Sequence, residues 1–344
     1  MIGLGIGAAT STISKLLLYW AIFFCICFGL GYPVLYHFDP RAVSPDSISY
    51  YELVRGRPAA ADYPLRCRVL VPWVAKPFFF WAVDHDLGRC DPAAFGLLMS
   101  NSLFTASAAL LLLLIGTACV GHNPAFAASL LFLLNFTIPN RQLCNGLVDS
   151  GECCCMLLLF CVLFWRKFYL LPIIAFLGAL AKESFVPMSA TATLAWAIYE
   201  YRHRTWKASA TIWSVIMVLT GLSTIVLLQQ SATGHLIWPW QYAGSVRSKH
   251  VSLLAGLAGC FTAHYFWFVF GYLLPLGLIR LRALPAAWVW ASAGAAAAAL
   301  AMGAWNNAGG DTVPSIFNSV GPVLCLATAL LLLDPAKKQR PTTS

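Results

Sequence analysis

The chain has 344 residues, of which 60% are hydrophobic and only 10% are charged, and its mean hydropathy is +0.74. Soluble domains of this size are not so apolar, so the composition excludes an ordinary globular enzyme. The formal net charge of +9 fits basic residues placed in loops between apolar segments, and it does not indicate nucleic-acid binding.

Apolar stretches near the ~20 residues needed to cross a bilayer recur along the chain. We therefore predict an all-α integral membrane protein with about ten transmembrane helices. The first apolar stretch, after Lys15, is too long for a cleaved signal sequence, so we expect it to be retained. The predicted segments are residues 14–36, 92–120, 124–138, 147–165, 168–181, 185–201, 208–230, 252–279, 285–305 and 313–333.

These segments divide the chain into four parts. An N-terminal transmembrane helix (1–36) precedes an extracytoplasmic loop with juxtamembrane helices (37–91). A polytopic helical membrane domain (92–334) and a cytoplasmic tail (335–344) follow. Residues 69–83 are apolar enough to resemble a span, but counting them as one would place the basic clusters outside. We expect them to lie along the surface or to dip in and out.

Basic clusters set the predicted orientation, because cytoplasmic loops are enriched in Lys and Arg. With both termini cytoplasmic, Glu200 and Asp334 are the two of 13 acidic residues on the inner side. The outer side then holds eleven acidic and eleven basic residues, which indicates a polar substrate handled there. The composition favours a bacterial inner membrane. The inner clusters are Arg166–Lys167, Arg202–Lys207, Arg280–Arg282 and Lys337–Arg340.

The loop 37–91 holds the first candidate site residues. Ser44-Pro45-Asp46 is typical of a helix start, and we expect a short helix from there to about Gly56. Asp46 or Asp39 at the outer surface can act as a general base toward an acceptor hydroxyl or amine. The alternative is structural, because Asp46 also suits a helix N-terminus and Asp39 suits the turn before Pro40.

Two arginines flank Cys67 later in the same loop. The guanidinium groups of Arg66 and Arg68, at the level of the lipid headgroups, suit phosphate or pyrophosphate, whose oxygens the planar fork binds bidentately. Simple snorkelling toward headgroups is the alternative.

Four more ionisable residues fall near the ends of predicted segments. Asp149 and Glu152 stand three apart on one helix face, and Lys182 and Glu183 occupy a sharp turn. Charges near membrane depth are costly, so they indicate a site or a mutual pair. The pair would join Lys182 to Asp149 or Glu152. The segment 168–181 reaches only ~21 Å of a ~30 Å core, so we expect this turn at or below the outer interface.

The twelve cysteines do not follow a metal-ligand pattern, so no metal site is predicted. Three of them, Cys67, Cys90 and Cys144, fall on the predicted outer side, where one disulfide could form, although the sequence does not select the pair. Motifs for nucleotide binding are lacking from the sequence.

Three short stretches together resemble the GT-C superfamily of polytopic, polyprenyl-phosphate-sugar-dependent glycosyltransferases. They are Asp46-Ser47-Ile48-Ser49-Tyr50-Tyr51 with Arg55-Gly56, Arg66-Cys67-Arg68-Val69-Leu70-Val71-Pro72, and Ala181-Lys182-Glu183-Ser184. The resemblance covers roughly residues 14–200. Members have a first membrane helix followed by a large extracytoplasmic loop with in-plane helices and an acidic catalytic residue.

The resemblance implies a glycosyltransferase in which Asp46 or Asp39 is the base. Arg66, Arg68 or Lys182 would hold the donor phosphate. The reaction would be an inverting displacement at the anomeric carbon, with the lipid phosphate as leaving group. A polyprenyl-phosphate-linked sugar and membrane lipid would be its partners, with no separate cofactor. One departure from the family is that the acidic residues are not adjacent.

Two other functions stay open. A transporter or flippase of a lipid-linked or small polar solute usually has charges near the midplane and repeated halves. Here the charges gather at one face, repeats are not evident, and one long loop dominates, which favours the enzyme. The third alternative is a non-catalytic membrane protein of envelope biogenesis.

Overall fold

The structure is a computed structural model that describes residues 6–36, 45–57, 67–86, 90–236, 238, 241 and 252–333. Every regular element within these residues is a helix, which confirms the all-α class. Asp39 and Arg66 lie outside the described residues, as does the predicted tail 335–344.

The described helices are of two lengths. The longer ones are α1 (Ile6–Gly31), α5 (Pro92–Val120), α9 (Phe185–Arg202), α10 (Ala208–Thr233), α15 (Ala286–Asn306) and α16 (Val313–Leu333). The shorter ones are α3 (Pro45–Val54), α4 (Leu70–Asp84), α6 (His122–Leu134), α7 (Asp149–Phe164), α8 (Leu171–Ala181), α12 (Leu253–Thr262), α13 (His264–Phe270) and α14 (Leu273–Arg280). The 3₁₀ turns are η1 (Tyr32–Tyr36), η4 (Phe168–Leu170), η5 (Leu281–Ala283) and η6 (Gly309–Thr312), and η3 (Ile138–Cys144) is a π-helix.

Several of these helices are long and apolar enough to cross a membrane. Six stretches of the described residues qualify by length and composition, and the pair η3 and α7, bent by 116°, would add a seventh. The protein is therefore a multi-pass membrane protein, but the count of about ten spans is not confirmed. Four predicted segments do not qualify by themselves: α6, α7 and α8 have only 13, 16 and 11 residues, and α9 is not apolar enough. The six stretches are 13–31, 92–120, 208–233, 264–283, 286–306 and 309–333.

One predicted segment, 252–279, is not a single helix. It is broken at Ala263, whose backbone is extended, and again near Gly271. The amide of Asn135 donates hydrogen bonds to the carbonyl of Val269 and to the hydroxyl of Tyr272, both at 3.1 Å. This side chain supplies a partner for the backbone beside the break, where a buried carbonyl would otherwise be costly.

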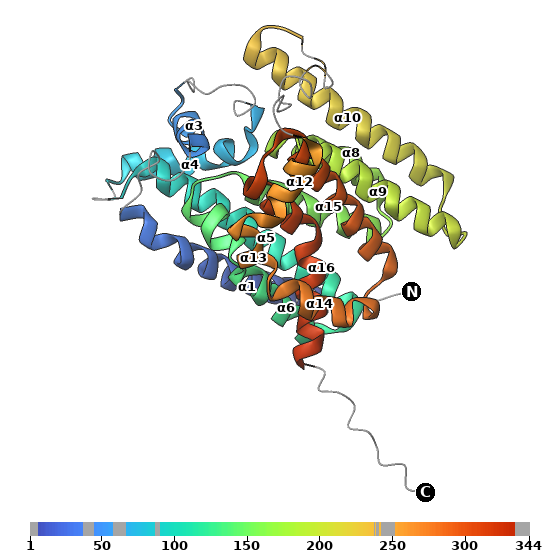
Figure 1. The fold of residues 1–344 in the computed structure, drawn as a ribbon. Helices are drawn as coiled ribbons and strands as arrows, with labels where there is room; N and C mark the ends of the chain where they lie inside the picture. The colour runs from blue at the N-terminus through green and yellow to red at the C-terminus, as the bar shows by residue number, and fades with distance from the viewer. Residues whose placement is uncertain are drawn as a thin grey trace, which may run out of the picture.

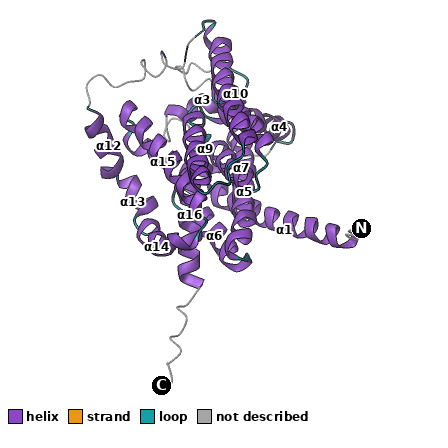
Figure 2. Cartoon of the chain, turned by 90° about the vertical axis from the view of Figure 1, so that its right-hand side faces the viewer, coloured by secondary structure: helices purple, strands orange, loops and turns teal. Residues whose placement is uncertain are grey.

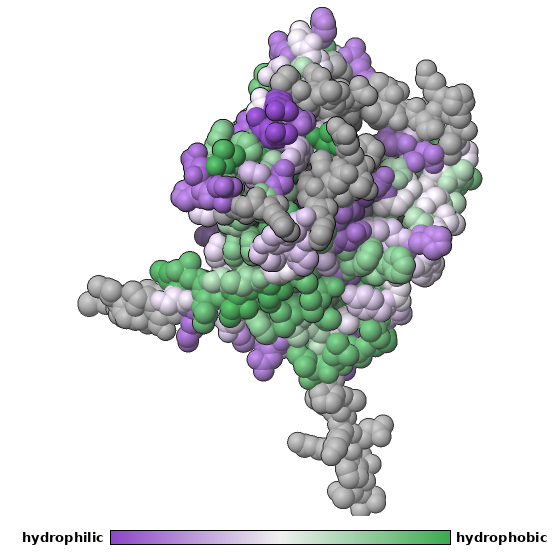
Figure 3. All heavy atoms as spheres, turned by 90° about the vertical axis from the view of Figure 1, so that its left-hand side faces the viewer, coloured by the Kyte–Doolittle hydropathy of each residue, from purple (hydrophilic) through white to green (hydrophobic). Residues whose placement is uncertain are grey.

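The helices form a bundle around α16 and α5. Figure 1 shows α5 and α16 in the middle, α3 and α4 on one side, and α8, α9 and α10 on the other. Figure 2 shows α1 projecting from the bundle, and Leu17 and Leu18 on this helix are more than half exposed. Figure 3 shows a broad apolar surface beside α1, with hydrophilic residues gathered above it. Such an apolar surface is typical of contact with lipid.

The short helix α3 is fixed against the bundle by polar contacts. It begins at Pro45, as the Ser-Pro-Asp pattern predicts. Asp91 caps α5 through the backbone N–H groups of Ala93 and Ala94, and its second oxygen accepts a hydrogen bond from the Tyr51 hydroxyl at 2.5 Å. The Ser47 hydroxyl donates to the carbonyl of Asn145, also at 2.5 Å. These contacts hold the first turn of α3 beside the N-terminal end of α7.

Basic residues lie at the ends of α7 and α9 that are remote from Asp149 and Glu152. Asp149 and Glu152 are in the first turn of α7, whereas Arg166 follows its last turn. Arg202 likewise ends α9, whose first residue follows the Lys182–Ser184 turn. Since α7 has 16 residues, its two ends are about 24 Å apart.

Candidate functional site

A cavity of about 920 Å³ lies where α3, α7, α9, α10 and α15 meet. One part of its wall is charged and the other is aliphatic. The charged and polar part comprises Asp46, Tyr50, Arg68, Arg141, Asp149, Lys182, Glu183, Ser184, Asp311 and Ser315. The aliphatic part includes Val186, Pro187, Ala190, Val218, Leu222, Ile225, Ala299 and Met302.

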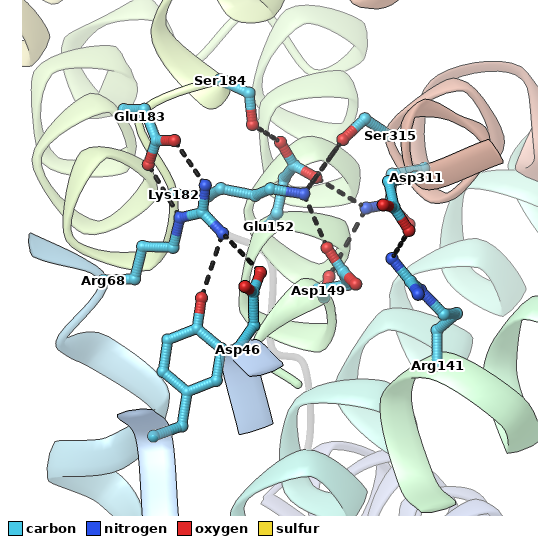
Figure 4. Close-up of polar contacts among 12 residues, drawn as sticks. Asp46, Arg68, Arg141, Asp149, Glu152, Lys182, Glu183, Ser184, Asp311 and Ser315 are labelled. Atoms are coloured by element: carbon cyan, nitrogen blue, oxygen red, sulfur yellow. Dashed lines mark hydrogen bonds and ion pairs between the residues drawn. The ribbon is translucent and has the colours of Figure 1, made fainter. Parts of the chain in front are cut away.

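Arg68 lies at the centre of the first charged group (Figure 4). It donates two hydrogen bonds to the Glu183 carboxylate, from Nε at 2.9 Å and from Nη2 at 2.5 Å. Its Nη1 donates to the Tyr50 hydroxyl at 3.0 Å and lies 3.9 Å from Asp46. The side chains of Arg68 and Glu183 are only 14% and 18% exposed, so this bidentate pair is largely removed from water.

Lys182 organises the second charged group. Its Nζ lies 2.7 Å from Asp149 and 3.6 Å from Glu152, and it donates to the Ser315 hydroxyl at 3.2 Å. Both carboxylates are buried, and the Lys182 side chain is 12% exposed. Lys182 thus forms ion pairs with both Asp149 and Glu152, the two partners that the sequence analysis considered for it.

Glu152 is held by neutral donors as well. The hydroxyls of Ser184 and Ser315 and the amide of Asn318 all donate to its carboxylate, with Ser315 at 2.9 Å and Asn318 at 3.0 Å. These donors come from two helix starts far apart in sequence, those of α9 and α16. Replacing a buried carboxylate that accepts this many hydrogen bonds would leave its donors without a partner, which is costly.

Helix ends explain why so many carboxylates gather here. Asp46 lies in the first turn of α3, Asp149 and Glu152 in the first turn of α7, and Glu183 just before α9. Each carboxylate therefore faces the positive end of a helix dipole. Lys182 follows the last residue of α8, where a positive charge is favourable. The local sequence thus stabilises the charges before any substrate is present.

Ion pairing fixes the charge states of the central residues. Burial by itself would raise the pKa of Glu183, but the charge and hydrogen bonds of Arg68 outweigh burial and hold this pKa below its ordinary value of 4.5. Burial likewise opposes the charge on Lys182, but Asp149 and Glu152 outweigh it and raise the pKa above the ordinary 10.5. Burial raises the pKa of Tyr50 to about 12, so its hydroxyl keeps its proton.

A third ion pair lies on the cavity wall. Nη2 of Arg141 is 2.8 Å from the Asp311 carboxylate, and the guanidinium carbon lies 5.8 Å from the centre of the Tyr265 ring. The Asp311 side chain is 73% exposed. This pair joins η3 to η6, which are 170 residues apart in the sequence.

The site carries more negative than positive charge. Five carboxylates, those of the three ion pairs together with Asp46 and Glu152, face three cations, so the formal charge of this cluster is −2. Four of the five have a close ion-pair or hydrogen-bond partner. Asp46 differs, because its ion-pair contact lies at 3.9 Å and its side chain is 44% exposed. Among the five, it is therefore the carboxylate that is both exposed and without a close ion-pair partner.

The structure brings together most of the residues selected from the sequence. Asp46, Arg68, Asp149, Lys182 and Glu183 line one cavity, and Glu152 lies behind Lys182. The same cavity includes residues that the sequence analysis did not assign to a site, namely Tyr50, Arg141, Asp311 and Ser315. The polar run Asn140-Arg141-Gln142 between two apolar stretches is the signal that could have identified Arg141.

The cysteines do not pair with one another in the structure. All twelve thiols are free in the structure, including Cys67, Cys90 and Cys144, and Cys153, Cys154 and Cys155 are buried in α7. Groups of three or more metal-ligating side chains do not occur among the described residues.

Neither the protein-family models nor the curated proteins contain a match to the sequence. The assignment of a function therefore rests on the geometry and chemistry of this cavity.

Proposed function

We propose that the protein is a glycosyltransferase that moves a sugar from a polyprenyl-phosphate donor to an acceptor at the extracytoplasmic membrane face. The observation that carries this proposal is that charged and aliphatic side chains line the same cavity. One part presents an accessible carboxylate among ion pairs, and the other is lined by aliphatic side chains. An amphiphile with a polar head and a hydrocarbon chain matches both parts.

The aliphatic part of the lining comes from α9, α10 and α15. Val218, Leu222 and Ile225 lie on one face of α10, spaced i, i+4 and i+7, and cover about 10 Å along its axis. Ala299 and Met302 of α15 line the same cavity, and α9 packs against both helices. Hydrocarbon placed here loses contact with water, which favours binding by about 0.8 kcal/mol per buried methylene group.

Asp46 is the proposed general base. Its carboxylate takes the proton of an acceptor hydroxyl or amine, and the freed oxygen or nitrogen attacks the anomeric carbon. The bond from that carbon to the phosphate oxygen breaks, and polyprenyl phosphate leaves with the electron pair. Because attack and departure occur on opposite faces, the configuration inverts. Arg68, held by Glu183, orients Asp46 from 3.9 Å.

The proposed orientation follows from the separation of charges along α7 and α9. The basic residues Arg166, Lys167 and Arg202 lie at the ends away from the cavity. The positive-inside rule then assigns those ends to the cytoplasm and the cavity to the outer face. In this proposal α6, α7, α8 and α9 also enter the membrane, which brings the number of membrane segments to about ten.

A transporter is the second candidate, because one observation favours it. The chain is bent by 116° between η3 and α7, directly beside the buried charges. Transporters commonly bind solutes at such interrupted helices. A transporter would move a solute across a sealed vesicle without any change in covalent structure.

The proposal is tested by sugar transfer in membranes that contain the full chain. The substrates are polyprenyl phosphates carrying a radiolabelled hexose or aminopentose. We expect label to leave the lipid fraction, and we expect Asp46→Asn to slow transfer by about a hundredfold or more. Asp84→Asn, at the exposed end of α4, is the matched control and should transfer normally. Equal transfer by Asp46→Asn and the wild type would refute Asp46 as the base.

A further inference from the structure

Two of the three cations that line the cavity are already fully engaged. Arg68 is bidentate to Glu183 and also bonded to Tyr50, and Lys182 is bonded to Asp149. An anion that bound to Arg68 or Lys182 would have to break a largely buried ion pair. Breaking such a pair leaves an uncompensated charge and is strongly unfavourable. These cations are better suited to hold the site together than to bind a substrate phosphate.

Arg141 differs from both of them in two respects. Its one ion-pair partner among the described residues, Asp311, has a side chain that is 73% exposed and can turn into water at little cost. Its Nε is buried and has no hydrogen-bond partner. The guanidinium group of Arg141 therefore has hydrogen-bonding capacity that the protein does not use.

The element that carries Arg141 is firmly anchored. Ile138, Gln142 and Leu143 of η3 are buried, and the side-chain oxygen of Gln142 accepts a hydrogen bond from Thr105 at 2.9 Å. A π-helical segment of this kind is uncommon and occurs frequently at functional sites. The anchoring presents the guanidinium fork to the cavity in a fixed position, which lowers the entropy lost on binding.

We infer that Arg141 is the residue that binds the phosphate of the substrate, by exchanging its exposed partner Asp311 for phosphate oxygens. The planar fork is matched to two such oxygens. When Asp311 turns away, a carboxylate leaves the negatively charged cluster, which reduces its repulsion of the incoming anion. The identification of the phosphate as that of a lipid-linked sugar rests on the proposed function, whereas anion binding by Arg141 does not.

The two members of this ion pair give opposite predictions for binding. The probe is farnesyl phosphate, titrated calorimetrically into the full-length protein in detergent. We expect Arg141→Gln to weaken binding by about tenfold or more, because a charge-assisted contact is lost. We expect Asp311→Asn to tighten it by about two- to fivefold, because the competing carboxylate is neutralised. A purely structural ion pair would not give opposite signs.

The control is an ion pair of the same kind away from the cavity. Arg166 lies 2.7 Å from Glu200 at the far ends of α7 and α9, and Arg166→Gln should bind farnesyl phosphate as the wild type does. Equal weakening by Arg141→Gln and Asp311→Asn, or no effect of either, would overturn the inference. Failure of the wild type to bind any phosphate probe would overturn it as well.

A second titration separates the sources of the phosphate. If inorganic phosphate binds far more weakly than farnesyl phosphate, the ligand is a lipid phosphate. If both bind equally and both depend on Arg141, the residue still binds phosphate, but the lipid donor of the proposed function is contradicted. If farnesyl phosphate binds as expected while no labelled sugar is transferred, the inference stands and the transferase fails.

Discussion

Replacing Glu183 by Gln tests whether the Arg68–Glu183 pair organises the site. The substitution keeps the shape of the side chain and removes its charge. Removing one partner of a buried ion pair typically costs about 3–5 kcal/mol. Here the side chains are 14% and 18% exposed, Gln still accepts one hydrogen bond, and Asp46 at 3.9 Å is a substitute partner. We therefore expect a loss of about 2 kcal/mol in the free energy of unfolding.

The assay is unfolding by increasing SDS in mixed micelles, followed by circular dichroism. Glu52→Gln is the matched control, because Glu52 lies 3.9 Å from Arg55 and 3.8 Å from Arg57 in a much more exposed setting. Such pairs contribute at most about 1 kcal/mol. If Glu183→Gln and Glu52→Gln cost the same, the Arg68–Glu183 pair does not stabilise the site as described.

The difference in unfolding free energy between the wild type and Glu183→Gln should depend on pH. Despite burial, Arg68 lowers the pKa of Glu183 below 4.5, so the carboxylate binds protons less readily in the folded protein than in the unfolded one. Its stabilisation is therefore fully present above about pH 4.5 and is lost as the pH falls through the lowered pKa. The difference between wild type and Glu183→Gln should shrink in acid. A difference that grew as the pH fell would contradict this pairing.

Four further substitutions probe the site and the packing of the helices. Lys182→Met leaves two buried carboxylates without their cation, and should cost about 3–5 kcal/mol in unfolding titrations. Gly96→Ala places a methyl group 2.8 Å from the carbonyl oxygen of Ala75, so α4 must shift, and we expect a loss of about 1–3 kcal/mol. Gly29→Ala meets no atom within 4 Å and should be neutral or stabilising in the same titration. Tyr50→Phe removes the acceptor of one Arg68 hydrogen bond, and should cost about 1 kcal/mol and slow sugar transfer.

Local patterns in the sequence predict the helices well. Each of the ten predicted segments contains helix in the structure, because hydropathy and breaks at Pro and Gly are local properties. The break of 252–279 near Gly271 was not predictable in this way. Beside it, the carbonyl of Val269 accepts a hydrogen bond from Asn135, which lies more than a hundred residues earlier.

The ion pairs of the site could also be predicted from the sequence only in part. The pairing of Lys182 with Asp149 and Glu152 could be predicted, because unpaired charges are costly near membrane depth. The role of Glu183 as the partner of Arg68 could not, since the two residues are 115 apart and either could have bound substrate. Arg141 was missed for a similar reason, because its partner lies 170 residues away.

The most direct test of the central claim is mass spectrometry of lipids that copurify with the protein. Wild type and Asp46→Asn are compared after gentle extraction. If the cavity binds a lipid-linked sugar and Asp46 is the base, the wild type should hold the product polyprenyl phosphate, and Asp46→Asn should hold polyprenyl phosphate that still carries its sugar. Bulk phospholipid alone in both proteins would contradict the claim.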